Sequence, residues 1–194
     1  AEEVCRGLPT TVVAASRSME AARAVQDLFR TPRFRVYTSN DLVGVELGGA
    51  LKNVIAIAAG AAAGMGFGDN TMAALVTRGL AEIARLGAAM GADPLTFAGL
   101  SGLGDLVVTC ASPHSRNRRL GMALARGATL QQALSEIGMA VEGVETARSV
   151  QALTATHGIE MPIASQVAET LFGRVPVQEA VTALMLRDPK PEKA

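Results

Sequence analysis

Two short apolar runs on either side of a helical pattern open the chain and predict a strand–helix–strand unit. Residues 10–15 (TTVVAA) and 34–38 (FRVYT) are rich in β-branched and aromatic side chains, which is typical of strands. Between them, residues 17–29 place apolar side chains at helical spacing. A helical crossover of this length joins parallel strands, and two strands alone cannot cover both faces of a sheet. We therefore expect residues 1–40 to be the remnant of a larger α/β domain.

From residue 41 onward the pattern predicts helices alone. The sequence is rich in Ala, Leu, Met, Glu and Arg, and Gly or Pro interrupts it roughly every ten to twenty residues. We expect helices at 41–64, 70–91, 94–99, 101–112, 115–126, 129–137, 143–157, 162–172 and 176–185. Typical helix-start residues are Asp69, Asp93 and Thr129, and typical stops are Gly91, Gly127 and Gly158. The fold class is therefore mainly α: a βαβ remnant, then one multi-helical domain over 41–194, with a frayed tail at 188–193.

Composition and charge exclude several classes of partner. The chain is 49% hydrophobic but only 3% aromatic, so its core must be built from aliphatic side chains. Eighteen basic residues balance eighteen acidic ones, so no net field attracts nucleic acid or an acidic membrane. The longest uncharged apolar run, residues 54–68, is shorter than the roughly 18 to 20 residues that a membrane span needs. We expect a soluble, cytoplasmic protein without a membrane span.

The cysteines and the first residue limit the interpretation further. Cys5 and Cys110 lack the spacing of a metal site or a redox pair, so we expect two buried thiols in a reducing compartment and no bound metal. The chain begins without Met and shows no targeting segment, which favours a processed product or a fragment.

Lys52 is the only lysine outside the last five residues. It interrupts the apolar stretch LGGALKNVIAIAAG, and burial lowers the pKa of a lysine amine toward the range useful for proton transfer. The alternative is a structural lysine that extends its amine to solvent or pairs with Glu46 or Asp105. Composition alone leaves both interpretations open.

A second polar cluster lies in SGLGDLVVTCASPHSRNRR. Asp105 and Thr109 are four residues apart, so a helix would place them on one face. Ser115, Arg116 and Asn117 follow Pro113 at a predicted helix start, where backbone amides, a guanidinium and short polar side chains can bind a phosphate. The alternative is a capped helix with a solvated basic face.

Other polar or glycine-rich positions carry weaker signals. The glycines at 64, 66 and 68 do not form GxGxxG and follow no strand, so we interpret them as a helix end. His114 and His157 lack metal-ligand spacing. Glu142 precedes a predicted helix, where a carboxylate is favoured by the helix dipole alone.

Several separated motifs together resemble one family. The stretches ELGGALKNVIAIAAG, GLGDLVVTC, SRNRRLG and VEG, in this order, are similar to the C-terminal part of bacterial NAD(P)-dependent glycerol-3-phosphate dehydrogenase. The opening AEEVCRGLPTTVVAAS and the FRVYTSND segment resemble the end of that family's nucleotide-binding domain. The resemblance implies that 1–40 is a remnant of the Rossmann-like NAD(P)-binding domain and that 41–194 is the helical substrate-binding and catalytic domain. The family's GxGxxG loop has no counterpart here.

The resemblance also implies roles for individual residues. Lys52 matches the proton acceptor that works on the secondary hydroxyl of sn-glycerol 3-phosphate. The positions that match substrate-binding residues of the family are Lys52, Asn53, Asp105, Thr109, Ser115, Arg116 and Asn117. Positions implied to contact NAD or NADP are Arg116, Ala140, Glu142 and Ala1. No metal is implied.

The expected activity is therefore the interconversion of sn-glycerol 3-phosphate and dihydroxyacetone phosphate by hydride exchange with a nicotinamide cofactor. The 194-residue chain is expected to be inactive alone. Two other readings stay open. One is a related dehydrogenase acting on another hydroxy substrate, and the other is a helical interaction or dimerisation module without catalysis. A homodimer is one expected assembly, because a sheet edge and an apolar face are left uncovered.

Overall fold

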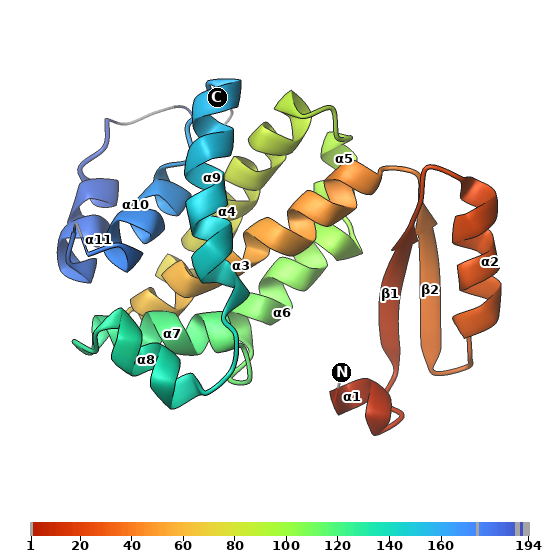
Figure 1. Ribbon diagram of the computed structural model, residues 1–194, viewed down its shortest axis with the longest axis horizontal. Coiled ribbons are helices and arrows are strands. Elements are labelled where there is room, and N and C mark those ends of the chain that lie inside the picture. Colours follow the sequence, from red (N-terminus) through yellow and green to blue (C-terminus); the bar gives the residue numbers. More distant parts are fainter. Residues whose placement is uncertain (1, 174, 189–190, 192–194) are drawn as a thin grey trace.

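The computed structural model describes residues 2–173, 175–188 and 191. Figure 1 shows a small sheet unit beside a larger body of helices. Within the described residues the chain is mainly helical, with one two-stranded parallel sheet, which confirms the predicted fold class. Most of the tail predicted at 188–193 lies outside these residues.

The strand–helix–strand unit forms as predicted. Its elements are α1 (Glu2–Cys5), β1 (Thr10–Ala15), α2 (Met19–Phe29) and β2 (Phe34–Ser39). The two strands pair in parallel over their whole length. Ser18 begins α2 by accepting a hydrogen bond from the backbone of Ala21, and Gln26 Nε2 donates to the Val36 carbonyl at 2.6 Å. That last bond joins the helix to the sheet. The short α1 was not predicted.

This unit leaves much of its apolar surface uncovered. Ala22 and Val36 are its buried side chains among the described residues, whereas Leu28 is 77% exposed and Phe29 is 55% exposed. Cys5 is exposed as well, so the prediction of two buried thiols is wrong for Cys5, because α1 packs against too little structure to cover it. Cys110 is buried as predicted.

The helical body begins after Asp41 and is organised around one long central helix. Its elements are α3 (Leu42–Gly64), α4 (Asp69–Ala89), α5 (Pro94–Phe97), the π-helical turn η1 (Leu100–Gly104), α6 (Asp105–Ala111), α7 (Arg116–Ala125), α8 (Leu130–Ile137), α9 (Glu142–His157), α10 (Pro162–Leu171) and α11 (Val177–Met185). Helix α3 is apolar around much of its circumference, which is typical of a helix buried on all sides. It packs against α4, α6, α7, α9 and α10 (Figure 1).

Glycines allow α3 and α7 to pack backbone to backbone. A side chain at Gly60 would meet the carbonyl of Arg118, and a side chain at Gly121 would meet the carbonyl of Ile57. The two helices therefore need a residue without Cβ at both positions. Their close approach brings the first turn of α7 against the middle of α3.

Most predicted helix boundaries are confirmed, with two differences. Asp93 and Thr129 are N-caps whose side chains accept backbone hydrogen bonds, as predicted, but Gly68 occupies the cap position of α4 and Asp69 lies in its first turn. The helix predicted at 101–112 begins instead with η1, a wider turn that its glycines permit. The predicted stops all adopt left-handed φ: Gly158 directly follows its helix, and Gly91 and Gly127 lie one residue further on, after Met90 and Arg126.

Two segments, Leu42–Gly64 and Pro94–Ala111, are long and apolar enough to cross a membrane by length and composition. The longest uncharged apolar run, residues 54–68, covers only part of the first segment, because Glu46 and Lys52 interrupt that segment. In the first segment half of the most apolar window is buried inside the body, as expected for the core helix of a folded domain. These segments are therefore weak support for a membrane span.

Candidate active site

Lys52 lies in the middle of α3 and forms an ion pair with Asp105, the first residue of α6. The lysine side chain is 20% exposed and the aspartate side chain 39% exposed, so a small molecule can reach the pair. Thr109, one turn along α6, donates its hydroxyl to the Asp105 carbonyl at 2.6 Å and lies 3.4 Å from the Asp105 Oδ1 atom. Three residues singled out in the sequence therefore meet at one place.

A buried pair of amides adjoins this ion pair. Asn53 is 5% exposed and Asn117 is 7% exposed, and Asn117 Nδ2 donates to Asn53 Oδ1 at 2.8 Å. Asn117 Oδ1 accepts from the backbone N–H of Gly143 at 2.9 Å, and Asn53 Nδ2 donates to Glu142 Oε2 at 3.2 Å. This network joins α3, α7 and the first turn of α9.

Arg116 and Ser115 define the start of α7. Ser115 caps the helix by accepting a bond from the backbone N–H of Arg118 at 3.3 Å. The guanidinium of Arg116 donates to the Ala140 carbonyl at 2.7 Å, and its Nη2 atom lies 3.9 Å from Glu142 Oε1. Ser115 is therefore a helix cap, as the alternative interpretation predicted. Arg116 is directed instead to Ala140 and Glu142, next to the start of α9.

The predicted residues converge through shared contacts. Lys52 meets Asp105, its neighbour Asn53 meets Asn117, and Asn53 and Arg116 both contact Glu142. The two cations, Lys52 and Arg116, and the backbone N–H groups at the start of α7 can bind an anion, while the lysine amine can exchange a proton. Ala1 lies outside the described residues. Among those described, no group of three or more His, Cys, Asp or Glu side chains is placed to hold a metal ion.

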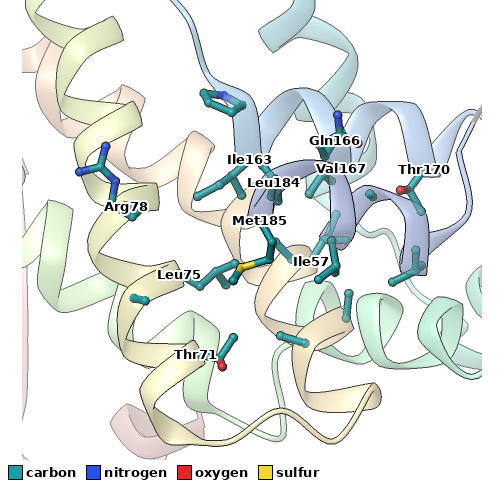
Figure 2. A pocket seen from close by; sticks show the side chains of 18 of the residues that line it. Ile57, Thr71, Leu75, Arg78, Ile163, Gln166, Val167, Thr170, Leu184 and Met185 are labelled. Atoms are coloured by element: carbon teal, nitrogen blue, oxygen red, sulfur yellow. The ribbon is translucent and has the colours of Figure 1, made fainter. Parts of the chain in front are cut away.

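A separate cavity of about 290 Å³ lies between α3, α4, α10 and α11 (Figure 2). Its walls are mostly apolar, with Ile57, Leu75 and Val167 among them, and Arg78 stands on one side. It does not include Lys52, Asp105 or Arg116, so it is distinct from the site described above.

Glu82 borders this cavity and was missed by the sequence argument. It is 3% exposed and accepts hydrogen bonds from the backbone N–H groups of Ile163 at 2.8 Å and Ala164 at 3.2 Å, which cap the start of α10. Burial raises the pKa of Glu82 to about 7, against the opposing effects of these bonds and of Arg85 and Arg187. Glu82 lies on the same face of α4 as Gly79, Ile83 and Leu86, and this helical spacing with apolar residues could have indicated its burial.

Comparison with known proteins gives close and extensive matches. The chain is 59% identical over 192 residues to glycerol-3-phosphate dehydrogenase (NAD(P)+) of Desulfitobacterium hafniense, covering 99% of this chain and 54% of the relative. It is 56% identical over 193 residues to the enzyme of that name from Chlorobium luteolum, covering 58% of the relative. The chain thus spans about half the length of the curated relatives it matches.

Solved structures agree with these sequence matches. The glycerol-3-phosphate dehydrogenase of Coxiella burnetii superposes with a TM-score of 0.92 at 44% identity, over 95% of this chain and 57% of that one. The enzyme from Saccharomyces cerevisiae superposes with a TM-score of 0.81 at 27% identity, over 93% of this chain and 55% of that one. The fold is that of the C-terminal, mainly helical part of these nicotinamide-dependent dehydrogenases.

The family profile described as "NAD-dependent glycerol-3-phosphate dehydrogenase C-terminus" matches residues 41–182. The chain belongs to the NAD-dependent glycerol-3-phosphate dehydrogenase family.

Proposed function

We propose that this chain supplies the proton-transfer and phosphate-binding groups of an enzyme that interconverts sn-glycerol 3-phosphate and dihydroxyacetone phosphate with NAD or NADP. The observation that carries the proposal is the Lys52–Asp105 pair, held beside the Asn53–Asn117 amides in a family of such dehydrogenases. On this proposal residues 41–194 form the catalytic and substrate-binding domain, and residues 1–40 belong to the nucleotide-binding domain. The relatives' names support a small-molecule substrate and a nicotinamide cofactor.

Lys52 is the proposed proton acceptor. In the oxidation, the C–H bond of the secondary alcohol breaks with its electron pair, the O–H proton passes to the Lys52 amine in its neutral form, and a carbonyl forms. The nicotinamide accepts the hydride when bound. In the reverse direction Lys52 returns the proton to the carbonyl oxygen. Asp105 keeps the amine in place, and the Thr109 hydroxyl in turn contacts the aspartate.

The substrate phosphate is proposed to bind at the start of α7. Arg116 supplies a charged fork, Asn117 an amide, and Ser115 ends the loop that exposes the first backbone amides of the helix. Binding at the phosphate contributes to catalysis by aligning the carbon that reacts at Lys52.

The start of α9 and Arg116 of α7 present exposed polar groups next to each other. The Glu142 side chain is 65% exposed and that of Arg116 is 37% exposed, so both can reach a bound molecule beside the amide pair. We propose that Arg116, Glu142 and the backbone at Ala140 contact the cofactor. Ala1 is proposed as a further contact from the preceding domain. We also propose that the enzyme is cytoplasmic, because its proposed substrates are soluble metabolites.

The test is a rate measurement with matched substrates. An enzyme in which this chain follows its nucleotide-binding domain should reduce dihydroxyacetone phosphate, followed by the loss of nicotinamide absorbance. Dihydroxyacetone without the phosphate should react far more slowly, because it loses the contacts at Arg116. Equal rates for the two compounds would contradict the phosphate site, and no reduction of either would contradict the proposed activity.

The isolated 194-residue chain gives a second comparison. We expect it to show no measurable rate, because no GxGxxG loop occurs in its sequence. A measurable rate with NADH or NADPH would show that the helical domain binds the cofactor unaided.

A further inference from the structure

We propose that the first turn of α9 fixes the orientation of the Asn53–Asn117 pair, and that Gly143 is the positioning residue that allows it. The inference rests on the proposed function, because the pair lies beside Lys52. The sequence signals and the family resemblance give Gly143 no role of its own.

Gly143 lies too close to the amide pair for any side chain. Its backbone N–H donates to Asn117 Oδ1 at 2.9 Å. A Cβ atom at this position would lie 2.6 Å from that same Oδ1 atom, 2.7 Å from Ile57 Cδ1 and 2.9 Å from the Asn53 carbonyl oxygen. Each distance is shorter than real Cβ contacts, so with any larger residue something must shift: the Asn117 amide and the Ile57 side chain, or, because the Asn53 carbonyl is main chain, the turn of α9 itself.

The contacts from α9 decide which way each amide faces. The Gly143 N–H requires an acceptor, so Asn117 presents Oδ1 to α9 and its NH₂ group to Asn53. Glu142 also requires a donor, so Asn53 presents Nδ2 to α9 and Oδ1 to Asn117. If the O and NH₂ of either amide were exchanged, a donor would face a donor at one of its contacts and an acceptor would face an acceptor at another. The observed orientation is therefore strongly favoured.

This orientation selects the donor that remains for a substrate. Asn53 uses both of its N–H bonds, on Glu142 at 3.2 Å and on the Gly49 carbonyl at 3.5 Å, and Asn117 uses one on Asn53 at 2.8 Å. Among the described residues, three of the four amide N–H bonds are therefore occupied. The second N–H of Asn117, at the start of α7, is left to bind a substrate oxygen.

The same turn of α9 borders the proposed cofactor contacts. Arg116 donates to the Ala140 carbonyl and lies beside Glu142, on the outer side of this turn. Moving the turn by enlarging Gly143 displaces the asparagine pair directly, whereas the exposed Arg116 side chain can follow. Substrate binding should therefore suffer more than cofactor binding.

The first experiment is Gly143→Ala in the whole enzyme, with Gly68→Ala as the control. Gly68 also lies at a helix start, but a Cβ there meets nothing within 4 Å. We expect Gly143→Ala to raise the KM for dihydroxyacetone phosphate about tenfold or more, consistent with the loss of one buried hydrogen bond, while the KM for NADH or NADPH changes much less. Equal increases in both constants, or none, would overturn the inference.

A double-mutant cycle separates positioning from general damage. If Gly143 acts through the Asn117 amide, Gly143→Ala should raise the substrate KM much less in the Asn117→Ala variant than in the parent. The reason is that the Asn117 Oδ1 atom is no longer there to be displaced. Fully additive losses would overturn the inference.

Glu142 provides a second test if Gly143→Ala does not fold. Glu142→Gln keeps an oxygen that can accept from Asn53 and Glu142→Ala does not, so Glu142→Ala should raise the substrate KM several-fold more than Glu142→Gln does. The same substrate KM for both variants would count against the inference. The unmodified enzyme is assayed first, so failure of the proposed activity is seen before any variant is compared.

Discussion

The sheet unit at residues 2–39 and the helical body that follows differ in how much of their apolar surface they bury. The first covers only Ala22 and Val36 among its described residues, although it carries large side chains such as Leu28 and Phe29. The second has one continuous core whose buried members run from Leu51 to Leu171. The difference shows that the body holds its site residues with its own core, whereas the sheet unit depends on further structure to be covered.

The largest expected effect concerns activity and lies wholly in the body. Lys52→Ala should lower kcat by about 10²- to 10⁴-fold, the usual contribution of general acid–base catalysis, because it removes the amine that is proposed to take the proton. The unfolding midpoint should stay near that of the parent. Arg119→Ala, which changes an exposed basic residue of α7, is the control. Near-normal turnover of Lys52→Ala would remove this lysine from the proposed mechanism.

Matched leucine truncations test the contrast in burial directly. Leu86 in α4 is 0% exposed and Leu28 in α2 is 77% exposed. Leu86→Ala should lower the free energy of unfolding by about 2–5 kcal/mol, because a cavity remains in the core. Leu28→Ala should change it by less than about 0.5 kcal/mol. Urea denaturation curves measure both, and similar losses for the two variants would contradict the contrast.

Glu82 gives the body a pH dependence of its own. Its pKa in the folded protein is about 7, above the ordinary 4.5, so the folded state holds a proton that the unfolded state has released. Stability should therefore be highest below pH 4.5 as far as this group is concerned and fall as pH rises to about 7, by roughly 3 kcal/mol at most.

The matched variant for this prediction is Glu82→Gln. The glutamine oxygen can still accept one bond at the start of α10, but it does not titrate. The difference in unfolding free energy between parent and variant should change across this pH window and stay flat above it. A constant difference at every pH would show that Glu82 keeps an ordinary pKa.

A smaller loss than that of Leu86→Ala is expected at the junction of the two regions. Asp41 caps α3 by accepting from the Gly44 backbone at 2.9 Å, and it also accepts from the Asp93 backbone at 3.0 Å and from the Thr96 hydroxyl at 2.6 Å. Burial raises the pKa of Asp41, but these bonds outweigh it and lower the pKa below 3.8.

Asp41→Ala should therefore cost about 1 kcal/mol of unfolding free energy at neutral pH, as for other lost helix caps, and the cost should shrink as pH falls below 3.8. Thermal denaturation at neutral and acid pH measures this. Asp69→Ala is the control, because Asp69 lies in the first turn of α4 without serving as its cap. A pH-independent cost would contradict the capping role of the ionised carboxylate.

Local patterns predicted most helices and both strands because caps, glycine stops and apolar spacing act over a few residues. They also marked Lys52 and the Ser115–Asn117 run. They did not predict η1 or the short α1, since neither has a distinctive local pattern, nor the burial of Glu82, which depends on contact with α10.

The pairing of Asn53 with Asn117 was likewise beyond local reasoning. The two residues are 64 positions apart, and only the packing of α3 against α7 brings them together. The roles assigned to individual site residues remain predictions that the kinetic experiments address.

The glycine contacts between α3 and α7 have a consequence for how this site can diversify. Main-chain atoms meet at Gly60 and Gly121, so the close approach of α3 and α7 rests on backbone contacts rather than on the side chains that line the site. Substrate preference could therefore be redesigned at a residue outside these contacts, such as Thr109, while the two helices that carry Lys52 and Asn117 keep their spacing.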